Sequence, residues 1–163
     1  MPNSTKKTDV VDSINHSSVD FRPQMDVINN TKMVKFIFVV PYSEHFSQMD
    51  ESTLKKFGCS YVTQNSARIA EIVELLNKAK IRYEPNHEGS WESRNGVFLT
   101  SENGTETKFL FDQHYQYPEN NTVQGELNEK PITANSSLLE DLYRWAAKLD
   151  SNTACEFFIS KYR

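Results

Sequence analysis

Two histidines that each follow an apolar run are the residues of this sequence best suited to chemistry. His45 lies next to Glu44, and His114 lies two residues after Asp112. Imidazole groups titrate near neutral pH, so two of them can divide the acid and base roles in cleaving a phosphodiester, with a carboxylate to orient each ring. These four residues define one hypothesis, a small hydrolase or nuclease-like enzyme.

The sequence carries none of the motifs that usually accompany such chemistry. It has no nucleophile elbow, no glycine-rich phosphate loop, and no histidines or cysteines at metal-ligand spacing. We therefore expect no metal and no cofactor. Polar loop residues that face water are the simpler interpretation of the histidines and their neighbouring carboxylates.

A second group of residues suits protein binding, and this is the hypothesis that we favour. Its members are aromatic and charged residues of the non-periodic segments: Tyr42, Glu88, Trp91, Glu92, Arg94, Asp112, Tyr115, Tyr117 and Glu119. Tyrosine, tryptophan and arginine are enriched at interface hot spots, and a rim of carboxylates steers a basic partner. The chain as a whole has a net charge of −4 and a pI near 5.6. These features predict a non-enzymatic interaction module.

The expected partner of such a module is a basic protein. Small acidic inhibitors that neutralise a basic toxin or nuclease, such as bacterial immunity proteins, have this general character, although no motif here identifies a family. The interface would consist of the loop around Trp91 and Arg94 and the loop after Asp112. A homodimer formed through a spare apolar sheet face is an alternative.

A weaker hypothesis is single-stranded RNA binding on an aromatic sheet face. Four rings alternate on two expected strands: Phe36, Phe38, Phe109 and Phe111. Paired rings on an open face can stack bases. The acidic balance argues against nucleic acid, because such binding depends on neutralising phosphates. We therefore expect these rings to form the layer beneath the helices, which leaves Ile37, Val39 and Leu110 to be covered on the opposite face.

The elements that position these residues are organised around the run Met33–Val40, which is rich in β-branched and aromatic residues and is closed by Pro41. Such a run predicts a buried central strand that ends before the proline. Asp50 is placed to cap a short helix, and Gly58 is placed to end it.

A longer helix is expected from Thr63 or Asn65 to about Lys80, because apolar residues recur there on one helical face. Asn103-Gly104 between two apolar runs predicts a hairpin, since both residue types tolerate positive φ. The segment 112–135 is expected to be a long loop. The remaining strands are expected at 81–84, 97–100, 108–111 and 155–160, with a last helix that starts at a capping box at Ser137.

This order of elements predicts an α+β domain, ferredoxin-like (split β-α-β) or a related antiparallel or mixed sheet with two main helices packed on it. The first and third main strands are expected to be central, adjacent and parallel, so the loops after Val40 and Phe111 open on the same edge. We expect a flexible polar tail over residues 1–32 and a single domain over residues 33–163.

The two cysteines complete the prediction. Cys59 and Cys155 have no second ligand or framework around them, and they read as two small buried hydrophobes in a reducing compartment. No apolar run is long enough for a membrane span, and no signal sequence is apparent. The sequence therefore predicts a cytoplasmic protein with no membrane contact.

Overall fold

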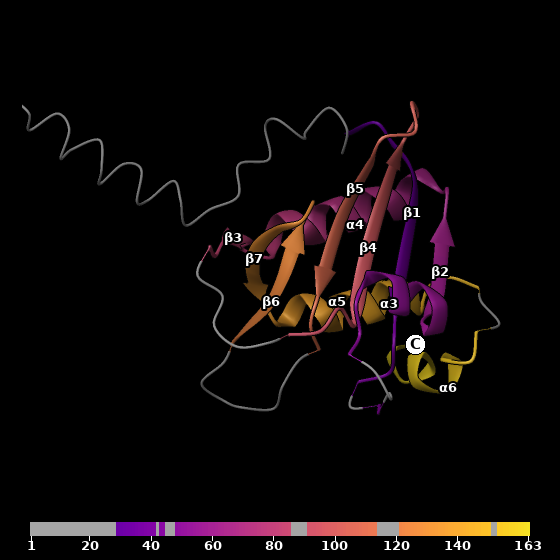
Figure 1. Ribbon diagram of the computed structural model, residues 1–163. Helices are drawn as coiled ribbons and strands as arrows, with labels where there is room; N and C mark the ends of the chain where they lie inside the picture. The colour runs from indigo at the N-terminus through magenta and orange to yellow at the C-terminus, as the bar shows by residue number, and fades with distance from the viewer. Residues whose placement is uncertain (1–28, 42, 45–47, 86–90, 114–120, 151–152) are drawn as a thin grey trace, which may run out of the picture.

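A computed structural model describes residues 29–41, 43–44, 48–85, 91–113, 121–150 and 153–163 (Figure 1). Its centre is one seven-stranded sheet in the order β2-β1-β4-β5-β6-β7-β3, with every neighbouring pair antiparallel. The strands are β1 (Thr31–Phe38), β2 (Cys59–Thr63), β3 (Arg82–Tyr83), β4 (Asn95–Ser101), β5 (Glu106–Phe111), β6 (Thr122–Leu127) and β7 (Lys130–Asn135). The helices are α3 (Glu51–Phe57), α4 (Ser66–Lys78), α5 (Ser137–Ala146) and α6 (Glu156–Ile159), followed by the 3-10 turn η1 (Ser160–Tyr162). The fold is α+β, as predicted.

A ferredoxin-like arrangement is not confirmed, because the sheet is larger than that plan and β4 lies between β1 and β5. The predicted adjacency of the first and third main strands is therefore wrong. Since β1 and β5 are both antiparallel to β4, they still run in the same direction, and their carboxyl ends lie at the same end of the sheet.

The main core lies between the sheet and the helices α4 and α5, which Figure 1 shows behind the strands. Alternate residues of β1 point into it, and Val34, Phe36 and Phe38 are all fully buried. Helix α4 presents Ile69, Ile72 and Leu76 to the same layer and begins at Asn65, whose side chain accepts a hydrogen bond from the Arg68 backbone amide. The predicted central strand and long helix are thus confirmed.

A second, smaller core covers the opposite face of the sheet. Helix α3 lies there, in front of the strands in Figure 1, and its Leu54 packs with Met49, with Val39 just after β1 and with the outward-facing strand residues Ile37, Phe98 and Leu110. Asp50 caps α3 by accepting a hydrogen bond from the Thr53 backbone amide, and Gly58 ends it, as predicted. The spare apolar face expected from the sequence is therefore covered in this region by the chain's own short helix.

The structure differs from the expected elements in three places. Residues 59–63, for which no element was predicted, form the edge strand β2, whose alternation of inward Cys59, Tyr61 and Thr63 is too short and polar to stand out. The segment 112–135 holds the hairpin β6–β7 instead of remaining a loop throughout, with its turn at Asn128 and Glu129, both at positive φ. Residues 155–160 form α6 and the start of η1 instead of a strand.

Two turn and cap predictions have different outcomes. The hairpin at Asn103-Gly104 is confirmed, with Gly104 at φ 88°. Helix α5 does begin at Ser137, but its N-cap Ser136 makes no side-chain capping hydrogen bond, so the predicted capping box is not formed. Packing of the apolar stripe of α5 accounts for the helix without it.

The cysteines are joined in a disulfide, which corrects the expectation of two free thiols. The fold brings the start of β2 next to the segment before α6, and the Cα atoms of Cys59 and Cys155 lie 6.0 Å apart. This separation is typical of disulfides.

None of the helices in the described part of the chain combines the length and the hydropathy that a membrane span requires.

Candidate interaction site at one end of the sheet

Three segments that are distant in sequence meet at one end of the sheet, where β1 and β5 finish and β4 begins. The Val39 backbone amide donates to the carbonyl of Arg94 at 3.0 Å, and the Arg94 amide donates to the carbonyl of Phe111 at 3.0 Å. The segments after Val40 and after Phe111 therefore leave the sheet at the same end. The predicted convergence of these two loops is confirmed at their described roots.

The side chain of Arg94 bonds to two of the segments that meet at this end of the sheet. It is only 8% exposed, and its Nη1 donates to the Ser43 carbonyl at 2.8 Å, while its Nε donates to Glu92 Oε2 at 3.1 Å. A guanidinium with several donors in fixed geometry can hold two segments at once. Arg94 thereby fixes the segment after β1 against the segment before β4.

The neighbouring segments are fixed by a second set of bonds. Gln48 Nε2 donates to the Trp91 carbonyl at 3.2 Å, and the Ser93 backbone amide donates to the Met49 carbonyl at 2.9 Å. The Met49 and Trp91 side chains both pack in the second core. The described residues on either side of the end of the sheet therefore form one connected framework.

Beneath this framework, a buried chain of hydrogen bonds reaches from helix α5 to the strand ends. The Tyr143 hydroxyl donates to Asn95 Oδ1 at 2.9 Å, and Asn95 Nδ2 donates to the Asp112 carbonyl at 3.1 Å. Burial strongly raises the pKa of Tyr143, so its hydroxyl stays protonated and remains a donor at neutral pH. Neither Asn95 nor Tyr143 was predicted as a site residue, because no local sequence signal connects positions so far apart.

We expect Tyr143→Phe to lower the free energy of unfolding by about 1–3 kcal/mol, because Asn95 Oδ1 would be left buried without its donor. Tyr162→Phe is the matched control, since Tyr162 packs on the ring of Tyr143 and no hydrogen bond to its hydroxyl is found in the described part of the chain. Urea unfolding of both variants measures the difference. Equal stabilities would mean that the Tyr143–Asn95 bond contributes nothing.

The described members of the predicted contact surface differ in exposure. Asp112 is 5% exposed, and its Oδ1 accepts a hydrogen bond from the Gln113 backbone amide at 2.7 Å. Arg94 is buried as well, whereas Trp91 and Glu92 are half-buried and Glu44 is exposed. Arg94 therefore serves to hold the strand ends together. Among the described residues of the predicted contact surface, only Trp91 and Glu92 have surface to offer a partner, and Glu44, predicted as an orienting carboxylate for His45, is exposed beside them.

The other predicted site residues lie outside the described residues: Tyr42, His45, Glu88, His114, Tyr115, Tyr117 and Glu119. The pairing of His45 with His114 stays a prediction. No group of three or more metal-ligating side chains occurs among the described residues. For the RNA hypothesis, Phe36, Phe38, Phe109 and Phe111 are all fully buried, so these rings offer bases no surface to stack on.

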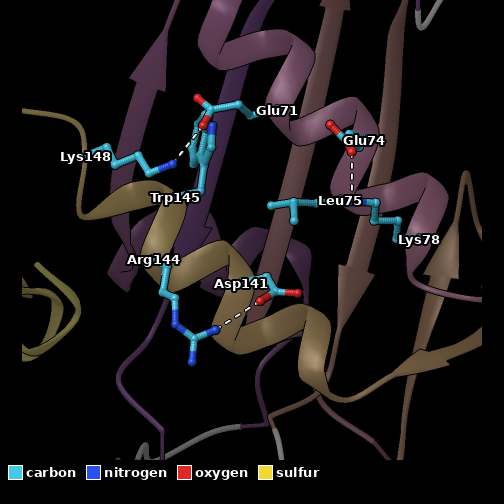
Figure 2. Close-up of a pocket in the computed structure, with 8 residues that line it drawn as sticks. All are labelled: Glu71, Glu74, Leu75, Lys78, Asp141, Arg144, Trp145 and Lys148. Carbon is cyan, nitrogen blue, oxygen red and sulfur yellow. Dashed lines mark hydrogen bonds and ion pairs between the residues drawn. The ribbon is translucent and has the colours of Figure 1, made fainter.

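A groove of about 250 Å³ lies on the far side of the molecule, between α4 and α5 (Figure 2). It is lined by Glu71, Glu74, Leu75, Lys78, Asp141, Arg144, Trp145 and Lys148. Each lining cation holds a carboxylate: Lys148 to Glu71 at 2.8 Å, Lys78 to Glu74 at 2.8 Å, and Arg144 to Asp141 at 3.0 Å. The Trp145 indole donates to the Arg68 carbonyl at 2.9 Å. The charges that line the groove are thus already paired: Lys148–Glu71 joins two segments, and the other two pairs each lie within one helix.

Comparisons with known proteins give no further assignment. No protein-family model matches the chain, and no curated protein or solved structure matches it.

Proposed function

We propose that this protein is a non-enzymatic interaction module, and most concretely an acidic inhibitor or immunity-type protein that binds and neutralises a basic enzyme. The observation that supports this best is the framework around Arg94, which fixes separate segments at one end of the sheet and leaves Glu44 exposed beside them. Binding residues concentrate on loops that a rigid scaffold positions. Loops held in place before binding also lose less conformational entropy when a partner arrives.

The charge of the described residues at this end fits a basic partner. Arg94 is buried and paired with Glu92, so it presents little positive charge to the solvent. Glu44 adds an exposed negative charge. Such a surface accelerates the encounter with a basic protein, and added salt weakens this steering because it screens exposed charges.

The disulfide changes the compartment in which we propose this binding occurs. The predicted cytoplasmic location rested in part on two free cysteines, and structural disulfides persist mainly in oxidising compartments. We therefore propose that the protein works in an oxidising compartment, where Cys59 and Cys155 stay joined.

Charge reversal of Glu44 tests the proposed surface on the purified complex with the basic partner. We expect Glu44→Lys to weaken binding about fivefold at low salt, which corresponds to about 1 kcal/mol, and to reduce the salt dependence of the affinity. Glu102→Lys is the matched control, because Glu102 is also exposed but follows β4 at the opposite end of the sheet. Titration calorimetry compares the two variants, and equal affinities for both would remove the interface from this end.

A further inference from the structure

The two edges of the sheet differ in how well they resist a further strand. Edge strand β3 has only two residues, one of them Arg82, and Pro85 follows it closely. Short strands, charges and prolines are the usual protection of a sheet edge. Edge strand β2, Cys59–Thr63, has five residues with no charge and no proline, and its register with β1 is continuous. Only the β3 edge is therefore protected.

The outer side of β2 is also open to hydrogen bonding. Its backbone pairs with β1 on one side, and among the described residues no backbone hydrogen bond joins its other side to another segment. An extended strand with free amide and carbonyl groups is a template for one more strand.

The exposed large apolar side chains of the described residues gather at this same edge. Val62 lies on β2 and is 47% exposed, and Phe57, two residues before β2, is 57% exposed. Phe157 is 66% exposed and lies two residues after Cys155, which is bonded to Cys59 at the start of β2. Single exposed apolar residues are ordinary, but these three all lie on β2 or on segments directly joined to it, so the surface near this edge is more apolar than is usual.

The charge around this edge is opposite in sign to that of the whole chain. Lys35 is the cross-strand neighbour of Val62, and Lys56 Nζ lies 5.3 Å from the centre of the Phe57 ring. Lys55 lies one residue before Lys56 on α3, where its charge is compensated by Glu51 at 3.0 Å. Lys35 and Lys56 make no ion pair within the part of the chain that the structure describes, so they leave positive charge beside the apolar residues.

We propose that the free edge of β2 is a docking site for an extended, acidic segment of a partner protein, which adds to the sheet as a further strand. In such strand addition the backbone bonds provide affinity, and alternate side chains of the added strand provide specificity. Val62, Lys35 and the helix α3 with Phe57 and Lys56 lie on the same face of the sheet. Every second residue of the added strand faces this side, so these positions would hold both apolar residues over Val62 and Phe57 and carboxylates toward Lys35 and Lys56. A second copy of this chain suits the edge less well, because it would bring two positively charged edges together.

The probe for this site is a capped seven-residue peptide with valine and glutamate in turn at every second position and threonine between them, so that both residue types face the same side. It is titrated into the full-length, isotope-labelled protein. We expect saturable NMR shifts of the backbone amides of Cys59–Thr63, with a dissociation constant on the order of 1 mM. A matched peptide with lysine in place of each glutamate should give no saturable shifts at this strand. If both peptides bind equally, or if the shifts occur elsewhere, the proposal is wrong.

Two substitutions on the protein separate the apolar and the charged contributions. Val62→Glu and Lys56→Glu are each expected to weaken binding of the acidic peptide about tenfold, whereas Lys130→Glu, at the first residue of β7, should leave it unchanged. Light scattering without peptide should show a monomer. A dimer that Val62→Glu dissociates would assign the edge to a second copy of the chain and overturn the proposal.

Discussion

Replacing Cys155 with alanine is expected to lower the free energy of unfolding by about 3–4 kcal/mol. The disulfide closes a loop with a sequence separation of 96 residues, and closing a loop of that size removes much of the conformational freedom of the unfolded chain. Alanine is the appropriate replacement because Cys155 is buried, and a serine would bury an extra hydroxyl.

The disulfide is not the only attachment of the C-terminal segment to β2. The hydroxyl of Tyr61 on β2 is hydrogen-bonded to Thr153 Oγ1 at 2.9 Å and donates to Glu156 Oε1 at 3.1 Å. The disulfide and these two hydrogen bonds therefore attach the same segment to the same strand.

Urea unfolding of the oxidised protein, the reduced protein and Cys155→Ala measures the contribution of the bridge. The reduced protein and the variant should agree, and the double replacement of Cys59 and Cys155 should cost about the same as the single one. A loss below about 1 kcal/mol would mean that the bridge does not constrain the unfolded chain as proposed.

Phe38→Ala is expected to be as costly, at about 3–5 kcal/mol, because it empties the centre of the main core. The Phe38 ring is fully buried, and its centre lies 5.2 Å from that of Phe36, 6.0 Å from Tyr61, 5.1 Å from Tyr143 and 5.8 Å from Phe158. These neighbours belong to β1, β2, α5 and α6, so one ring connects the sheet to both C-terminal helices.

The control for this prediction is Phe157→Ala, the same substitution at a side chain that is 66% exposed. It should change the free energy of unfolding by no more than about 0.5 kcal/mol. Denaturant unfolding at one temperature compares the two variants. Similar losses for both would show that Phe38 is not the centre of the core. Because Phe38 lies opposite Cys59 in the sheet, its loss should not add simply to the loss of the disulfide.

The parts of the fold that could be predicted carry their signal within a short stretch of sequence. The β-branched and aromatic residues around Phe36 predict β1, and the apolar helical face together with the Asn65 cap predicts α4. The Asn103-Gly104 turn likewise follows from two residues that tolerate positive φ. In each case local preference and the final packing agree.

The parts that could not be predicted depend on distant contacts. Strands β6 and β7 carry Gly125 and Pro131 among polar residues, so their alternation becomes visible only once they pair with each other and with β5. Phe157, Phe158 and Ile159 read as a strand, but the segment is attached to β2 through Cys155 and forms a helical turn there. In this four-residue helix Ile159 is buried and Phe158 packs against the core, whereas the side chain of Phe157 remains exposed.

The candidate site divides in the same way. The convergence of the segments after β1 and β5 was predicted from strand direction, and it holds even though β4 lies between them. The burial of Arg94 and Asp112 was not predictable, because in the sequence both read as surface charges. Their environment comes from Ser43 and Asn95, which contact them from other strands or loops.

Affinity capture is the measurement that tests the proposed function most directly. The tagged, disulfide-bonded protein would be exposed to an extract of its source cells at low salt, alongside the Glu44→Lys variant, and the bound proteins would be identified by mass spectrometry. We predict one basic protein in stoichiometric amount, released by salt and retained less well by the variant. A clean monomer that retains no basic protein under these conditions would contradict the account of an acidic inhibitor.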